Sequence, residues 1–166
     1  SDTDDTIVNS NEIKEEDGVI IELTDGVNGQ PTFTGYLSCE KSDVINSNSV
    51  YAIIQKDKLT AARWKIHGNI NTDAQIECIG IFNNHFKGWL CAHNTEINLR
   101  DGGSVYMSVQ KSKTNASRFK MNTTTRIIET IGENSEIPIY PNFKGYVAQE
   151  FIPKNIYIYM MLSPEK

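Results

Sequence analysis

Gly35-Tyr36-Leu37 and Arg63-Trp64-Lys65-Ile66 are the stretches that decide the fold class of this chain. Both return later, as Gly88-Trp89-Leu90 and Arg118-Phe119-Lys120-Met121, at an offset of roughly 54 residues. Each stretch is short and mixes apolar with polar residues, as half-buried strands do. An internal period of this size is typical of repeat folds, among them the β-trefoil. The stretches therefore indicate an all-β fold with a repeated unit.

The similarity continues between these stretches, because Ser49-Val50-Tyr51 and Gln55-Lys56 return as Ser104-Val105-Tyr106 and Gln110-Lys111. A third copy is expected to start near Gly145-Tyr146-Val147, which leaves too little chain to complete it. Two similar antiparallel hairpins also arise in any all-β fold. The repeat therefore leaves both a β-trefoil and a two-sheet sandwich open.

Outward from these stretches, short apolar or alternating runs are separated by Asn, Asp, Gly and Ser, the pattern of strands joined by turns. Helix signals are weak: Lys56–Ile66 has few apolar residues at helical spacing, and a short helix over Asn142–Gln149 stays open. The pattern predicts a sandwich or barrel. The predicted strands are Val19–Leu23, Thr34–Cys39, Val50–Gln55, Arg63–Ile66, Ile76–Phe82, Trp89–His93, Val105–Val109, Arg118–Met121, Arg126–Ile131, Tyr146–Phe151 and Ile156–Leu162.

Length and charge point to one domain behind an acidic leader. The 166 residues carry a formal charge of −5, and residues 1–18 hold seven acidic residues against Lys14, which is −6. We therefore expect a flexible acidic leader over residues 1–17 and a single near-neutral domain over 18–166. A near-neutral body does not favour nucleic acid as a partner. No apolar run approaches the roughly 20 residues of a membrane span, so we expect no membrane insertion by this domain.

No motif for metal binding or catalysis is present. Cys39, Cys78 and Cys91 are an odd number, which fits three thiols or one bridge with a free thiol. Cys91 and His93 would share one face of a strand, but neither metal-ligand spacing nor a third catalytic group accompanies them. We therefore expect no metal, no cofactor and no enzymatic activity, with a Cys91–His93 nucleophile as the minor alternative.

The richest candidate for binding is the segment Asn83-Asn84-His85-Phe86-Lys87-Gly88-Trp89. Glycan sites combine an aromatic ring, which packs on the apolar face of a sugar, with amide and basic groups that bond its hydroxyls. The alternative is a polar hairpin turn followed by a core tryptophan, and for Trp89 itself we favour the core. Trp64 is also expected in the core, with Arg63 and Lys65 facing the other side.

Three segments resemble the head domain of the rotavirus outer-capsid spike protein. Ile79–Trp89, followed by His93-Asn94-Thr95-Glu96, is similar to that family's strand, polar turn and basic residue before a tryptophan. Arg63-Trp64-Lys65-Ile66 resembles its Arg-Trp-Lys-Phe strand, and Glu150–Lys154 resembles its Phe-Tyr-Ile-Ile-Pro-Arg segment. The three stand in the same order as in the family.

The resemblance implies a galectin-like antiparallel β-sandwich that attaches a virion, through its outer capsid, to host cell-surface glycans. It also implies the stalk fragment of the same spike protein as a partner. Phe33-Thr34-Gly35-Tyr36 lacks the arginine of the sialic-acid-binding members, so we expect a neutral, histo-blood-group-type glycan instead. The candidate glycan-binding residues are Asn83, Asn84, His85 and Lys87 on one turn, with Tyr36, Arg100 and Tyr146 as outer positions.

A second hypothesis follows from the repeat rather than from the resemblance. A β-trefoil of this size would suit a protein-binding module, cytokine-like or actin-bundling-like, whose compartment the sequence does not fix. Threefold pseudosymmetry around a capped barrel favours this alternative, whereas two stacked sheets favour the galectin-like sandwich.

Overall fold

The computed structural model describes residues 18–24, 34–40, 49–81, 84–92, 99–100, 104–131, 137–141, 147–149 and 159–164, and the acidic leader expected over 1–17 lies outside them. The described residues form strands with almost no helix, so the all-β prediction is confirmed. The strands are β1 (Val19–Thr24), β2 (Thr34–Cys39), β3 (Ser49–Gln55), β4 (Ala62–Asn69), β5 (Asp73–Ile81), β6 (Asn84–Ala92), β7 (Leu99–Arg100), β8 (Ser104–Gln110), β9 (Arg118–Met121), β10 (Ile128–Ile131), β11 (Ile137–Pro141), β12 (Val147–Gln149) and β13 (Tyr159–Pro164). Two single-turn 3₁₀ helices, η1 (Lys58–Thr60) and η3 (Lys113–Asn115), follow β3 and β8.

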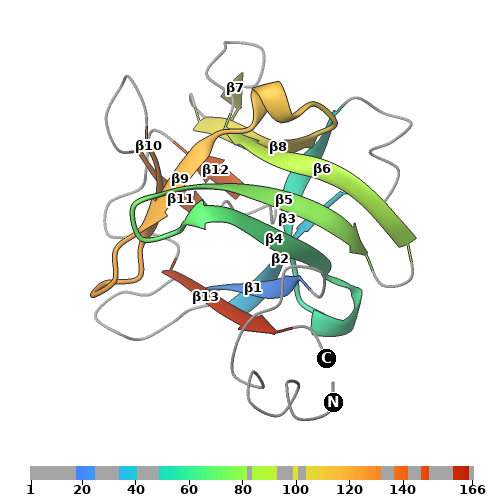
Figure 1. The fold of residues 1–166 in the computed structure, drawn as a ribbon. Helices are drawn as coiled ribbons and strands as arrows, with labels where there is room; N and C mark the ends of the chain where they lie inside the picture. The colour runs from blue at the N-terminus through green and yellow to red at the C-terminus, as the bar shows by residue number, and fades with distance from the viewer. Residues whose placement is uncertain are drawn as a thin grey trace, which may run out of the picture.

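Antiparallel pairing closes the sheet into a seven-strand barrel (Figure 1). The path runs through β1, β2, β3, β8, β6, β5 and β4 and returns to β1. The return is made by one residue pair, Val19 opposite Trp64. In Figure 1, β4 and β5 cross the front, with β6 and β8 above them and β1 and β13 below.

The strand pairings repeat along the chain with the same register. Residues that pair in β1 to β4 have counterparts in β5 to β9, 53 to 55 positions later in the sequence. These counterparts pair with each other in the same way. The equivalent pairs are Val19–Trp64 and Ala74–Phe119, Glu22–Tyr36 and Glu77–Trp89, Leu23–Gly35 and Cys78–Gly88, and Tyr36–Gln55 and Trp89–Gln110. The two 3₁₀ helices stand at this offset as well. The sequence repeat is therefore a repeat of structure.

A third copy is present in β10 to β13, so the expectation that the chain ends too early for it was wrong. Glu129 lies opposite Pro138 as Glu22 lies opposite Tyr36. The backbone N–H of Met160 donates to the carbonyl of Arg126 at 2.9 Å, at the place of the Val19–Trp64 pair. The copy starts at β10 rather than near Gly145-Tyr146-Val147. Of those three residues, Val147 lies in β12 and the other two lie outside the described residues.

Equivalent positions of the three copies fill the core. One large side chain from each copy is fully buried: Trp64, Phe119 and Met160. In the neighbouring paired strand, the residues opposite them are Cys78, Thr130 and Leu23, respectively, which are also equivalent to one another. Ile21, Ile76 and Ile128, which precede Glu22, Glu77 and Glu129, are buried beside them. Both tryptophans are buried, as predicted for the core, but only Trp64 belongs to the continuous apolar cluster inside the barrel.

Glycine in the repeated Gly35-Tyr36-Leu37 motif has a packing reason. A Cβ at Gly35 would collide with the Ile54 side chain of the neighbouring strand β3. A residue without a side chain therefore lets β2 and β3 approach at this position. The side chain of Ile54, from the neighbouring strand β3, thus occupies the space that a side chain at position 35 would need.

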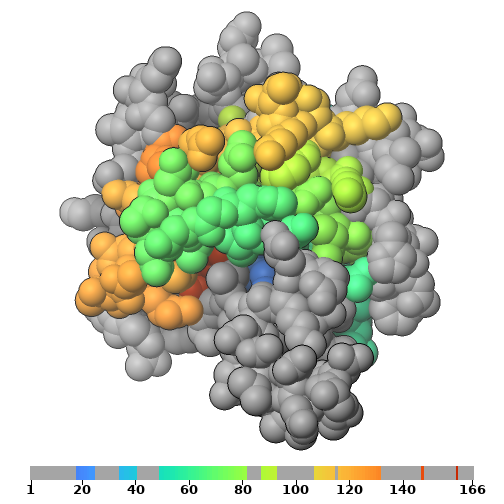
Figure 2. Space-filling model, viewed as in Figure 1, coloured from blue at the N-terminus to red at the C-terminus, as the bar shows by residue number. Residues whose placement is uncertain are grey.

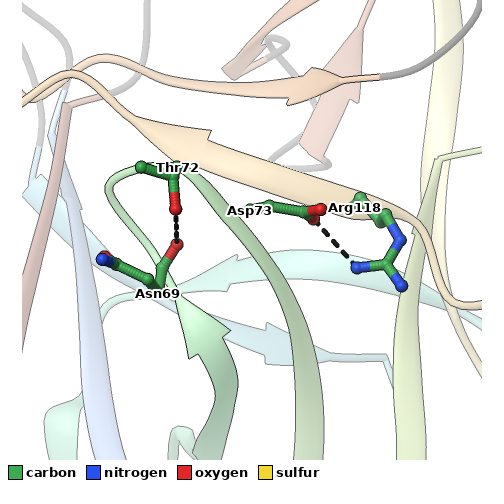
Figure 3. Close-up of polar contacts among 4 residues, drawn as sticks. All are labelled: Asn69, Thr72, Asp73 and Arg118. Atoms are coloured by element: carbon green, nitrogen blue, oxygen red, sulfur yellow. Dashed lines mark hydrogen bonds and ion pairs between the residues drawn. The ribbon is translucent and has the colours of Figure 1, made fainter.

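The turn between β4 and β5 connects the first two copies (Figure 3). Within it, the N–H and the Oγ1 of Thr72 donate to the carbonyl of Asn69 at 2.9 and 3.4 Å. The guanidinium of Arg118, the first residue of β9, lies 2.9 Å from the Asp73 carboxylate. Both side chains are about half exposed, so we expect this pair to contribute little more than alignment.

Most predicted strands are confirmed, with Thr34–Cys39 and Arg118–Met121 matching residue for residue. Two strands were missed. β11 contains Pro138 and Pro141, which remove backbone donors and make a strand hard to recognise from sequence. β7 spans only two residues. The open helix over Asn142–Gln149 is wrong for Val147–Gln149, which pair with β8 and β11 as β12.

Candidate functional site

Three polar side chains form a row on the outer face of the barrel. Glu22 of β1 lies opposite Tyr36 of β2, and Tyr36 lies opposite Gln55 of β3. Directly opposed residues of antiparallel strands have Cβ atoms about 4.5 to 5.5 Å apart. All three side chains are half-buried, while the alternate residues of these strands pack into the core. We call Glu22, Tyr36 and Gln55 the open row.

Hydroxyl groups border the open row on two sides. Gln55 Nε2 donates to Oγ1 of Thr60, in η1, at 2.7 Å, which fixes the carboxamide. Thr34 Oγ1 lies 3.3 Å from Thr24 Oγ1, two residues along the strands from Tyr36 and Glu22. Within the described residues, neither the Glu22 carboxylate nor the Tyr36 hydroxyl has a hydrogen-bond partner. As far as the described residues go, the row therefore offers a carboxylate beside an aromatic ring, with an amide and hydroxyls around them.

The second copy contains an equivalent row, and the chain itself covers it. Glu77 lies opposite Trp89, and Trp89 lies opposite Gln110. We call these three residues the closed row. His67 Nε2 lies 2.8 Å from Glu77 Oε1, with its ring centroid 4.9 Å from the Trp89 ring. Lys113 Nζ lies over Trp89, 5.2 Å from the ring centroid.

Burial separates the two rows. Glu77 and Trp89 are only 6% and 7% exposed, although both lie on the outer face, whereas Glu22 and Tyr36 are half-buried. In Figure 2, β4, β5, β6 and η3, the elements that hold His67, Glu77, Trp89 and Lys113, lie side by side on the front face. The open row therefore leaves its carboxylate and ring partly accessible to a ligand. The closed row shows which chemical groups can cover a carboxylate and a ring in this arrangement.

The candidate residues of the segment 83–87 lie on a strand rather than on one turn. Ile81 pairs with Asn84, so the hairpin connection has only two residues, and β6 already begins at Asn84. Lys87 is exposed on β6, and His85 pairs with Gly80. Asn83 lies outside the described residues. The prediction that these residues share one turn is therefore wrong for Asn84, His85 and Lys87, because a two-residue connection places them in the strand.

The remaining candidates are spread over other hairpins. Tyr36 is in the open row, and Arg100 is in β7 opposite Ser104. Tyr146 lies outside the described residues. Tyr36, Lys87 and Arg100 therefore lie on three different strands, β2, β6 and β7. The structure thus does not bring the predicted residues together in one site. Tyr36 is the predicted residue that lies in a row of polar side chains, between Glu22 and Gln55.

Sequence reasoning missed Glu22 and Gln55 as partners of Tyr36. A signal was available, because Glu22 and Glu77 stand at the offset of the sequence repeat, as do Gln55 and Gln110. Only the strand register shows that these equal spacings bring carboxylate, ring and carboxamide together. His67 and Lys113 were missed for the same reason, since each reaches the closed row from a different element.

The three cysteines are buried thiols, which decides between the two arrangements left open by the sequence. Cys91 Sγ donates to the carbonyl of Trp89 at 3.3 Å. Burial raises the pKa of Cys91 to about 12 and also raises the pKa of Cys78. Because the thiolate is the reactive form, a neutral Cys91 is a poor nucleophile near pH 7. Its suggested partner, His93, lies outside the described residues.

We expect Cys91 to resist alkylation by iodoacetamide at pH 7 in the folded protein and to react fully in denaturant. Since its folded pKa lies above the ordinary value of 9.0, stability should be retained below pH 9 and decrease as the pH rises toward 12. Urea denaturation across this pH range measures the decrease, and Cys91→Ala should lessen it. Rapid alkylation of Cys91 in the folded protein at pH 7 would contradict this description.

Among the described residues, no group of three or more His, Cys, Asp or Glu side chains is arranged to hold a metal ion. The same residues include no helix with the length and apolar character needed to cross a membrane. Comparisons of the chain with protein-family models, curated proteins and solved structures gave no match.

Proposed function

We propose that this chain is a glycan-binding module with a β-trefoil topology and that the open row is its site. The topology is supported by the threefold recurrence of register, with Trp64, Phe119 and Met160 in equivalent places. It is the alternative that the sequence left beside the galectin-like sandwich. A three-copy barrel accounts for the constant offset between the repeated stretches, whereas two stacked sheets supply no reason for it.

The observation that carries the function is the open row itself. A half-buried tyrosine ring offers a surface for the apolar face of a sugar, and Glu22, Gln55 and the nearby threonines can bond its hydroxyls. Cleavage of a glycosidic bond ordinarily requires two carboxylates across the bond. Within the described residues the row contains one, Glu22, so its composition favours binding over hydrolysis.

Attachment of a virion to host cells, with a stalk fragment as partner, is proposed on the resemblance of the three segments alone, and the β-trefoil topology proposed above departs from the galectin-like sandwich that this resemblance implies. The open row adds to it the same chemistry, a glycan held by a ring and polar groups. Affinity at one such site is expected to be weak, because a single sugar buries little area. Many copies on one particle would raise the overall strength of attachment.

The first test is a glycan array probed with multivalently displayed protein. We expect binding to one related set of glycans, reduced at least about tenfold by Tyr36→Ala, which corresponds to about 1.4 kcal/mol. Tyr36→Phe, which keeps the ring, should retain most of the signal. Lys87→Ala serves as the matched control, because Lys87 is exposed on β6 outside the row.

Two outcomes would oppose this proposal. A silent array from folded protein would contradict the proposed glycan binding. Binding lost in Lys87→Ala but kept in Tyr36→Ala would instead place the site on β6.

A protein-binding module is the second candidate, favoured by Leu59, which is 73% exposed on η1 beside Thr60. A silent array would make this candidate the one to pursue.

A further inference from the structure

The closed row shows how the chain satisfies a carboxylate and a ring at this position of the fold. In the second copy, the imidazole of His67 bonds Glu77, and the ammonium of Lys113 lies 5.2 Å over Trp89. An ammonium group over an aromatic face is attracted by the ring quadrupole. Glu77, which lies opposite Trp89 in the strand pairing, brings a carboxylate to the same row. The protein therefore fills this row with two nitrogen groups of its own, an imidazole and an ammonium.

The open row has the same acceptors, and among the described residues no imidazole or ammonium is seen to contact them. Glu22 and Tyr36 stand where Glu77 and Trp89 stand, by identical register. Lys58, the counterpart of Lys113 in η1, is exposed, and within the described residues no basic side chain lies over the Tyr36 ring. A ligand can thus supply in the first copy what Lys113 supplies in the second.

We infer that the open row takes the protonated amine of an amino sugar, with its ammonium beside Glu22 and over the face of Tyr36. This rests on the proposed function and names its ligand class. The sugar ring then packs along Tyr36, and Gln55 and Thr60 face its hydroxyls. Lys58, exposed on η1, carries the same charge as this ligand and should weaken its binding.

The probe is a fully deacetylated glucosamine tetramer, compared with the same tetramer carrying N-acetyl groups, which have no charge. We expect the deacetylated form to bind at least about tenfold more tightly, since it alone offers an ammonium. Glu22→Gln should reduce this preference to about twofold, because the amide keeps the shape and loses the charge. Lys58→Ala should increase affinity for the deacetylated form two- to threefold, and Glu129→Gln, at the equivalent position of the third copy, should change neither.

The outcomes separate this inference from the proposed function. If both tetramers bind equally, or if Glu22→Gln weakens both alike, the amine preference is overturned while glycan binding stands. If neither tetramer binds but an array glycan does, the ligand class is wrong and the function remains. A lysine-rich peptide that binds through Tyr36 while both tetramers fail would replace the sugar by a protein. Failure of the tetramers together with a silent array would overturn both proposals.

Discussion

Replacing Trp64 with alanine is expected to cost about 3 to 5 kcal/mol of folding free energy. Trp64 is fully buried, and its Nε1–H donates to the carbonyl of Leu37 at 3.1 Å, so the change removes both packing and a hydrogen bond. It also lies opposite Val19 in the pair that closes the barrel. Urea denaturation followed by circular dichroism measures the loss, which would be a large part of the stability of a typical domain.

Trp64→Phe is the matched control for this experiment. Phenylalanine already occupies the equivalent place in the second copy as Phe119, which is fully buried too. We therefore expect a smaller loss than with alanine, because a ring still fills much of the space. If Trp64→Ala were as stable as the wild type to within about 1 kcal/mol, the core built from equivalent positions would be incorrect.

Removing the imidazole of His67 is expected to destabilise the protein by about 2 kcal/mol, because it takes one hydrogen-bonding partner from a buried carboxylate, which also lies opposite Lys65. Glu77 is 6% exposed, and the His67–Glu77 contact is 2.8 Å. The imidazole also covers Trp89, so His67→Ala exposes apolar surface in addition. Glu22 in the open row is only half-buried, so a smaller penalty is expected there.

A double-mutant cycle isolates this interaction. His67→Ala, Glu77→Gln and the double variant are compared by urea denaturation, and we expect a coupling of about 1 kcal/mol or more for groups in direct contact. Glu77→Gln alone should cost less than His67→Ala, since an amide is easier to bury than a charge. Additive losses would mean that the contact contributes nothing and that the closed row is held by packing alone.

The positions of most strands could be predicted from sequence, because alternation and turn residues are local signals. Thr34–Cys39 is an example: its apolar positions alternate and its glycine precedes an aromatic residue. The third copy could not be recognised, since Pro138 stands where the other copies have Tyr36 and Trp89. With only two similar copies visible, the sequence did not decide between a repeated barrel and a sandwich.

The candidate site was harder to predict, because it depends on which strands lie side by side. A run such as Asn83–Lys87 attracts attention by concentrating polar and aromatic residues in one segment. Glu22, Tyr36 and Gln55 are far apart in the sequence and meet only through the register of β1, β2 and β3. Tyr36 was predicted for its ring, but its partners follow from the pairing alone.

The central claim, that a glycan lies on the Tyr36 ring, is tested most directly by titrating the best array glycan into isotope-labelled protein and following backbone amide shifts by NMR. We predict saturable shifts at Glu22, Tyr36 and Gln55, which belong to three strands but to one surface. Lys87 and its neighbours on β6 should remain unshifted. Shifts confined to β6, or no saturable shifts at any glycan concentration, would contradict the account.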